Sequence, residues 1–124
     1  MRLHEPLAEF VDDRGRLVTL FNDARWVEAN YLESRADVVR GNHYHRHTHE
    51  MVFMLEGEVE IHIVNVQTGQ EKRTRLKPGE LICIEPYEAH AFRAKTFGRW
   101  LNFLSVAYDA ANPDCTRFEI ERRD

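Results

Sequence analysis

The segment GNHYHRHTHE, residues 41–50, carries histidines at positions 43, 45, 47 and 49 and a glutamate directly after the last of them. Side chains of a β-strand alternate between the two faces of a sheet, so histidines at this spacing would share one face of a straight strand. Glu50 would then point to the opposite face. If the chain instead turns a corner around residues 46–49, His43 and His45 end one strand and Glu50 opens the next, facing the same interior.

The remaining chain has a β pattern almost throughout. Residues 58–66 alternate, with Val59, Ile61 and Ile63 on one face and polar residues on the other, and this pattern predicts a strand with His62 exposed. Turn signals occur at QTGQ and KPGE. Further extended segments are expected at residues 16–21, 27–35, 36–45, 50–57, 81–86, 90–94 and 99–108, with a short edge strand at 117–121. Short alternating strands with frequent turns predict an all-β sandwich or barrel without a long helix.

The composition predicts one globular domain. A chain of 124 residues has room for a single core, so residues 1–124 are expected to form one domain. The net charge of −4 argues against nucleic acid as a partner. No apolar run is long enough to span a membrane, and the opening residues lack a signal-peptide core. Cys83 lies in the apolar run LICI and is expected to be buried. We therefore expect a cytoplasmic protein without a membrane partner.

The histidine segment and a distant histidine predict a metal site. Two imidazoles two residues apart on a strand converge on one point, and Glu50 and His90 supply two more donors if the chain turns the corner. Neutral imidazole and carboxylate suit one divalent transition ion such as zinc, iron, manganese or nickel, with positions left open for water or substrate. The predicted metal ligands are His43, His45, Glu50 and His90. The other two histidines of the segment belong to the corner and are not expected to bind.

These residues resemble the first motif of the cupin superfamily, HxH(x)3–4E(x)6G. The matching positions are His43, His45, Glu50 and Gly57. The resemblance implies a single-domain jelly-roll β-barrel with the metal inside and a barrel core over about residues 15–108.

The second cupin motif, G(x)5PxG(x)2H, is matched in part by GELICIEPYEAH. Gly79 and His90 fall in place, whereas Glu85 replaces the usual proline and Tyr87 the usual glycine. A glycine that usually precedes the first motif is also replaced, by Asp37.

A narrower resemblance concerns DDRG, which contains Arg14, and RGNHYH, which begins with Arg40. These segments are similar to paired segments of nucleotide-sugar cupins: dTDP-4-dehydrorhamnose 3,5-epimerases, dTDP-sugar 3,4-ketoisomerases, and the cupin domain of a capsular polysaccharide enzyme. The resemblance implies that Arg14 and Arg40 meet the phosphates of a sugar nucleotide. It also implies that His43 or His45 moves protons beside a keto group. Many of the ketoisomerases have glutamine at the position of Glu50 and act without metal.

Three functions are compatible with these features. The first is an isomerase or epimerase of a keto-sugar nucleotide in polysaccharide biosynthesis, in which a histidine, Tyr44 or Tyr87 exchanges protons and a metal or an arginine stabilises the oxyanion. The second is an Fe(II)-dependent dioxygenase, and the third is a non-catalytic sugar-binding or sensing cupin. A homodimer is expected, since open sheet edges favour pairing and the segment before Arg14 is able to cross to a partner.

Overall fold

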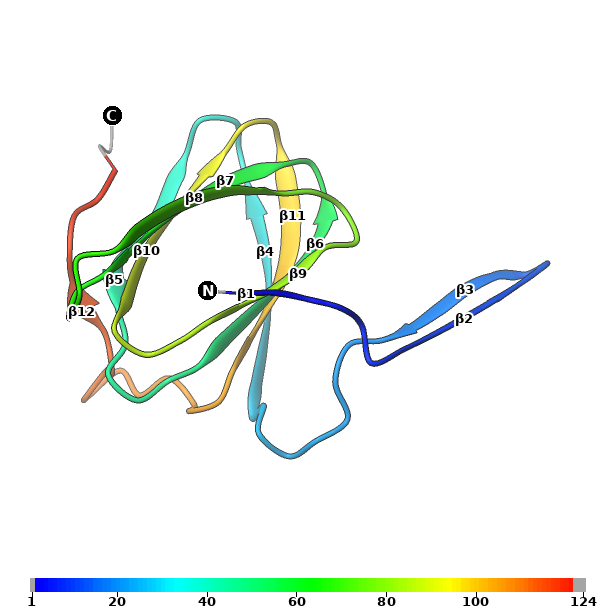
Figure 1. Ribbon diagram of the computed structural model, residues 1–124, viewed down its shortest axis with the longest axis horizontal. Coiled ribbons are helices and arrows are strands. Elements are labelled where there is room, and N and C mark those ends of the chain that lie inside the picture. The colour runs from blue at the N-terminus through cyan, green and yellow to red at the C-terminus, as the bar shows by residue number, and fades with distance from the viewer. Residues whose placement is uncertain (1, 122–124) are drawn as a thin grey trace.

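The computed structural model describes residues 2–121, which form twelve strands and no helix (Figure 1). The first six strands are β1 (Arg2–His4), β2 (Ala8–Asp12), β3 (Gly15–Thr19), β4 (Glu28–Ser34), β5 (Val39–Tyr44) and β6 (Glu50–Glu56). The last six are β7 (Val59–Asn65), β8 (Glu71–Leu76), β9 (Leu81–Ile84), β10 (Glu88–Ala94), β11 (Gly98–Leu104) and β12 (Thr116–Arg117). In the described part of the chain, no helix is long and apolar enough to span a membrane.

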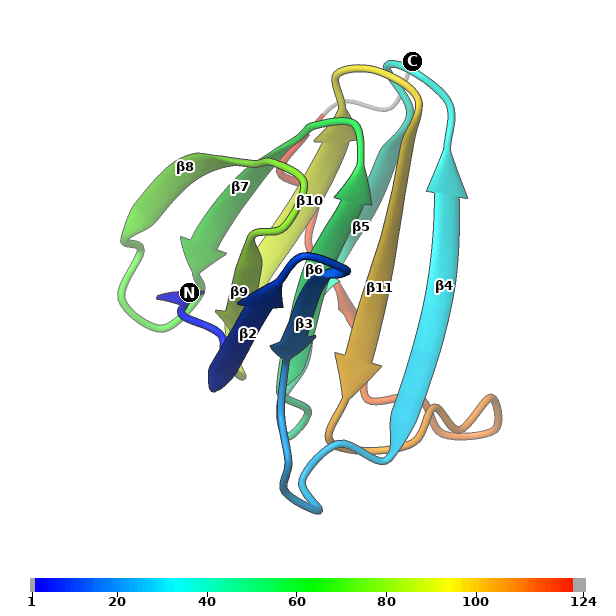
Figure 2. The same cartoon turned by 90° about the vertical axis from the view of Figure 1, so that its right-hand side faces the viewer.

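Two five-stranded sheets build the body of the molecule. One has the order β1-β9-β6-β11-β4, and the other has the order β12-β5-β10-β7-β8 (Figure 2). All strand pairs in both sheets are antiparallel. The predicted all-β jelly-roll fold is confirmed. Strand β5 lies in one sheet and β6 in the other, so the corner between them takes the chain from one sheet to the other.

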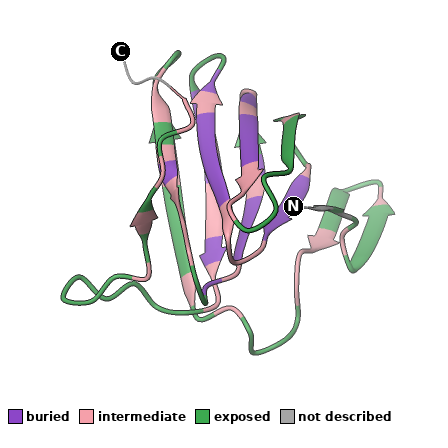
Figure 3. Cartoon of the chain, turned by 60° about the vertical axis from the view of Figure 1, so that its left-hand side comes forward, coloured by how far each residue is buried: buried purple, intermediate pink, exposed green. Residues whose placement is uncertain are grey.

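The main core cluster contains residues of both sheets, and the buried residues concentrate on the central strands (Figure 3). Val59, Ile61 and Ile63 of β7 are almost fully buried, as their alternation predicts, and they pack with Val52 and Met54 of β6. A smaller apolar cluster covers the outer face of the sheet that contains β6, β9 and β11, and it includes Met51, Leu81 and Phe103. Strand β6 therefore packs on both faces, and its inward positions are 50, 52 and 54. Cys83 is buried, as predicted.

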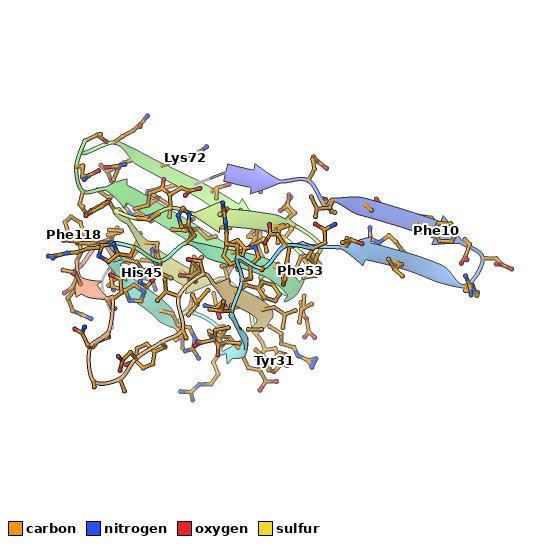
Figure 4. All side chains as sticks on the ribbon, turned by 90° about the horizontal axis from the view of Figure 1, so that it is seen from below. Phe10, Tyr31, His45, Phe53, Lys72 and Phe118 are labelled. Atoms are coloured by element: carbon orange, nitrogen blue, oxygen red, sulfur yellow. The ribbon has the colours of Figure 1, made fainter. Side chains whose placement is uncertain are left out.

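Strands β2 and β3 form a separate hairpin that projects from the body (Figures 1 and 2). Phe10, Val11 and Leu17 are each exposed by 60% or more on it. Phe10 lies at the far end of the molecule from His45 (Figure 4). Arg14, at the tip, donates to the Asp12 carboxylate and is otherwise open to solvent.

The C-terminal segment runs along the outside of the β5 sheet and is fastened there by Asn42. The Asn42 side chain is fully buried, and its Oδ1 accepts hydrogen bonds from the backbone N–H groups of Ile120 and Glu121 at 2.9 and 3.0 Å. Its Nδ2 donates to the Glu121 carbonyl, and its own carbonyl accepts from the Phe118 N–H. The tail is therefore held as an additional edge of the sheet, where β12 pairs with β5.

Candidate metal and substrate site

A bulge in β5 directs the site residues into the interior. His43 pairs with His90 and Gly41 with Ala91, so Asn42 is an extra residue in β5. Gly41 and Asn42 both have positive φ angles, 97° and 61°. A Cβ atom on Gly41 would lie 2.6 Å from the His90 carbonyl oxygen, which only glycine avoids. The bulge allows Arg40 and His43, three residues apart, to line one cavity while Asn42 faces the tail.

The corner between β5 and β6 is organised by Asp114 of the C-terminal segment. Its carboxylate accepts hydrogen bonds from the backbone N–H groups of Arg46, His47 and Thr48 at 2.8–2.9 Å. It also accepts from the Thr48 hydroxyl at 2.8 Å. The turn before β6 is fixed in this way, and Glu50 enters β6 on the inward face, as the corner interpretation predicts.

Three imidazoles and one carboxylate converge inside the barrel. His43, His45 and His90 each offer a ring nitrogen, and these three atoms lie within 4.8 Å of one another. Glu50 Oε1 lies 3.4 Å from His45 Nε2 and 3.5 Å from His90 Nε2. The structure thus brings together the four residues that the sequence predicts as ligands.

Backbone carbonyls fix the orientation of two of these rings. His45 Nδ1 donates to the Asp114 carbonyl at 2.6 Å, and His90 Nδ1 donates to the Glu88 carbonyl at 2.9 Å. A carbonyl only accepts, so both Nδ1 atoms carry a proton, and each Nε2 faces the centre, where it presents a lone pair whenever the ring is neutral. This is the arrangement in which protein histidines bind metals. The donor set therefore fits a divalent transition ion.

Burial and mutual contact set the charges of the cluster. Burial alone would raise the pKa of Glu50, but its contacts with His45, His90 and Asn102 hold that pKa well below the usual range. Burial lowers the pKa of His90. Burial also opposes the charged form of His45, but hydrogen bonds with Glu50 and the Asp114 carbonyl outweigh it and raise the pKa of His45. The carboxylate is therefore ionised and His90 is neutral at neutral pH, the forms that bind a metal.

The cluster lies in a cavity of about 350 Å³ between the two sheets. Its walls are largely apolar, with contributions from Leu32, Phe92, Trp100, Leu104 and Val106. Polar lining comes from Glu28, Asn30 and Asn102 on the β4–β11 side and from Arg40, Asp114 and Cys115. Sequence reasoning missed Asn102, although an asparagine in phase with the inward Trp100 and Leu104 is a detectable signal.

The two predicted phosphate-binding arginines are far from equivalent. Arg40 lines the cavity, where its Nε donates to the Ser34 hydroxyl at 2.5 Å and its Nη2 to the Glu33 carbonyl at 2.8 Å. It is the only arginine or lysine lining the cavity in the described part of the chain. Arg14 lies on the projecting hairpin and does not reach the cavity of its own chain.

Other residues singled out in the sequence lie outside the cavity. The rings of Tyr44 and Tyr87 contact each other at a centroid distance of 6.1 Å, and neither residue lines the cavity. Tyr44 lies between His43 and His45 in the sequence and faces the other side of the sheet. His47 lies on the exposed corner, and His49 Nδ1 is 2.7 Å from the Glu85 carboxylate. We therefore assign no catalytic step to either tyrosine.

The prediction that His62 is exposed is wrong. His62 is 6% exposed, and its two ring nitrogens lie 2.7 Å from Glu71 and 3.0 Å from Glu121. The C-terminal tail covers it, a contact that the local alternation of β7 does not contain.

A family model described as a cupin domain matches residues 36–105, more than half of the chain and all four residues of the cluster. The chain belongs to the cupin family. No curated protein matches this cupin in a sequence comparison.

Solved structures with the same fold include three nucleotide-sugar or polysaccharide proteins. The capsular polysaccharide assembling protein CapF from Staphylococcus aureus superposes with a TM-score of 0.72 at 20% identity, over 94% of this chain and 34% of CapF. This cupin therefore spans about a third of the CapF chain. The dTDP-4-dehydrorhamnose 3,5-epimerase from Bacillus anthracis superposes with a TM-score of 0.77 at 19% identity, over 91% of this chain and 75% of the epimerase. A double mutant of the QdtA 3,4-ketoisomerase from Thermoanaerobacterium thermosaccharolyticum superposes with a TM-score of 0.72 at 24% identity, over 90% of this chain and 83% of the ketoisomerase. These likenesses establish the fold.

Proposed function

We propose that this cupin is a metal-dependent isomerase or epimerase that acts beside the keto group of a nucleotide-activated deoxy sugar in polysaccharide biosynthesis. The observation that carries the proposal is the convergence of three imidazoles and an ionised carboxylate in the lining of a cavity large enough for a sugar ring. The likeness to epimerases and a ketoisomerase supports the choice of substrate class.

The proposed ligands are His43, His45, Glu50 and His90, for one ion of zinc, iron, manganese or nickel. Such an ion, when bound, acts as a Lewis acid that polarises a carbonyl oxygen. A histidine that binds through Nε2 and donates through Nδ1 has no lone pair left for a proton. The role of His45 in the metal-loaded protein is therefore to hold and orient, and we propose that a different group moves the proton.

Glu28 is the cavity carboxylate best placed to exchange that proton. Glu28 and Glu50 both pair in register with Leu104, so they lie in one row across the sheet, separated by one strand. Two strand spacings separate the two residues by roughly 9–10 Å. A sugar whose carbonyl oxygen faces the cluster would therefore bring the neighbouring carbon within proton-transfer distance of Glu28. Hydrogen bonds from Asn30 and the Tyr108 N–H lower the pKa of Glu28, so it is ionised at neutral pH. The other wall carboxylate, Asp114, is occupied by the corner.

Recognition of a diphosphate is proposed for Arg40 and, from a second copy, Arg14. Arginine meets phosphate oxygens in pairs, which a lysine ammonium does not. The Arg14 hairpin projects away from its own cavity and carries exposed Phe10, Val11 and Leu17, which supports a homodimer in which the hairpin is buried on the partner.

A second candidate function is an Fe(II)-dependent dioxygenase. The specific observation in its favour is the apolar wall of Leu32, Phe92, Trp100 and Val106 with a single lining cation among the described residues. An apolar substrate would fill such a cavity better than a charged one.

Two measurements separate the candidates. Elemental analysis of the purified protein should find about one divalent transition ion per chain. A panel of nucleotide sugars should then raise the melting temperature of the metal-loaded protein, since binding to the folded state stabilises it by mass action. Oxygen consumption by the iron-loaded protein with apolar substrates, and no response to any nucleotide sugar, would instead support the dioxygenase.

A further inference from the structure

Asn102 of β11 connects the metal-site carboxylate to the cavity. Its Nδ2 donates to Glu50 Oε2 at 3.1 Å. An ionised carboxylate only accepts, so the amide nitrogen must face Glu50 and Oδ1 must face the other way. Oδ1 is buried and has no hydrogen-bond partner among the described residues. Since Asn102 lines the cavity, a buried carbonyl acceptor lies unused next to the predicted metal ligands.

The neighbouring wall supplies no donor for this oxygen. Asn30 is directly opposite Asn102 on β4, but its Nδ2 donates to Glu28 Oε2 at 2.8 Å. On the other side, Asn102 pairs with Val52, and it lies between the inward Trp100 and Leu104 along β11. A buried acceptor without a partner costs free energy, which a ligand donor in the cavity recovers.

We propose that Asn102 holds Glu50 in position through Nδ2 and, through Oδ1, accepts a hydrogen bond from a substrate hydroxyl on the carbon next to the oxygen that faces the cluster. The inference rests on the proposed function and deepens it: the substrate is an α-hydroxy carbonyl compound, and an analogue that lacks the hydroxyl is rejected. A site built to pair a hydroxyl discriminates against its absence, because the protein acceptor is then left buried and unpaired.

The test uses two small probes that differ by one hydroxyl, glycolate and acetate, titrated into Co²⁺-loaded protein and followed by the cobalt absorption spectrum. The natural protein should bind glycolate more tightly than acetate. Asn102→Leu removes both amide contacts at similar volume, and should cut that preference by about tenfold, the effect of one hydrogen bond with a buried partner left unpaired. Its Co²⁺ affinity should also fall by about 10–100-fold, as for other groups that orient a metal ligand.

Asn102→Asp separates the two roles. It keeps an oxygen acceptor at this position but replaces the amide donor with a second carboxylate beside Glu50, so the Co²⁺ affinity should change while the preference for glycolate persists. Asn112→Leu is the control, the same change of side chain at an exposed asparagine outside the cavity lining, and should leave both the preference and the Co²⁺ affinity unchanged.

Equal preference in the natural protein and Asn102→Leu, or loss of the preference in Asn102→Asp, would overturn the inference. Failure of Co²⁺ to bind would overturn it together with the metal site. A lost preference in Asn102→Leu alongside no response to any keto-sugar nucleotide would retain Asn102 and reject the sugar class.

Discussion

Replacement of Asp114 by alanine should destabilise the protein by about 3 kcal/mol. Its carboxylate accepts four hydrogen bonds from the corner before β6, two of them from the N–H and hydroxyl of Thr48. Arg46 and His47 are exposed, so water replaces their lost partner at little cost. Thr48 is 4% exposed, and two buried donors left without a partner cost about 1–3 kcal/mol each.

The assay is urea denaturation at neutral pH, with Asp109→Ala as the control. Asp109 lies in the same tail and accepts a hydrogen bond from one exposed N–H, that of Ala111, so its loss should cost less than about 0.5 kcal/mol. A loss of about 3 kcal/mol corresponds to a fall of roughly 10 °C in melting temperature for a domain of this size. Equal stabilities of the two variants would refute the assignment of Asp114 as the organiser of the corner.

The same residue makes a pH prediction of defined sign. Burial opposes the charge of Asp114, but the hydrogen bonds from the corner outweigh it and lower its pKa to about 2. A carboxylate with a lowered folded-state pKa stabilises the protein above its unfolded pKa of about 3.9 and loses that contribution as pH falls toward 2. Because Asp114 is partly exposed, we expect roughly 1–2 kcal/mol from this source. The stability difference between the natural protein and Asp114→Ala should shrink between pH 4 and 2, and a constant difference would contradict the account.

Four further predictions concern the site and the assembly. Glu50→Gln should weaken metal binding, measured by competitive chelation, more than His47→Ala or His49→Ala does, and equal losses in all three variants would exclude this ligand set. Metal occupancy should also fall as the pH drops through the histidine range near 6.5, because protons compete with the metal for the ligands. Glu28→Gln should abolish proton exchange with substrate while elemental analysis still finds the metal, and retained exchange would remove Glu28 from the mechanism. Asn42→Ala should speed hydrogen exchange at the tail amides that it holds, and unchanged protection would mean that other contacts hold the tail. Light scattering should give a homodimer, and a mass of 14.7 kDa at micromolar concentration would exclude it.

Local patterns in the sequence were sufficient to predict the four clustered residues. The spacing of His43, His45 and Glu50 places all three inward if the chain turns a corner after the first strand, and the structure contains that corner. Val59, Ile61 and Ile63 were likewise predicted as inward residues by alternation alone. In both cases the information lies within about ten residues of the chain, whereas the distant His90 was placed by the second cupin motif.

Contacts between distant segments could not be predicted. His45 donates to a carbonyl 69 residues away, at Asp114, and His62 contacts Glu121, 59 residues away. Both partners belong to the C-terminal segment, whose irregular sequence carries no period that places it against β5 and β7. Asn42, which holds that segment, lies in a bulge, and strict alternation along a strand does not predict a bulge.

Two departures from the cupin motifs conceal a retained backbone conformation. Asp37 and Tyr87 stand where glycine is usual, and both have a φ of 67°, in the left-handed region. Asparagine and aspartate visit this region more readily than other residues, whereas a tyrosine there costs roughly 1–2 kcal/mol. The turn geometry of the motif is therefore kept without its glycines, and a letter-by-letter comparison underestimates the match.

The most direct test of the proposed function is ¹H NMR of a 4-keto-6-deoxy sugar nucleotide in D₂O, with metal-loaded and metal-stripped protein. We predict that the proton on a carbon beside the ketone exchanges for deuterium with the metal-loaded protein, and that exchange stops when the metal is removed and returns when it is restored. No exchange with any of several keto-sugar nucleotides, or exchange at the same rate after metal removal, would contradict the claim that this site is a metal-dependent isomerase.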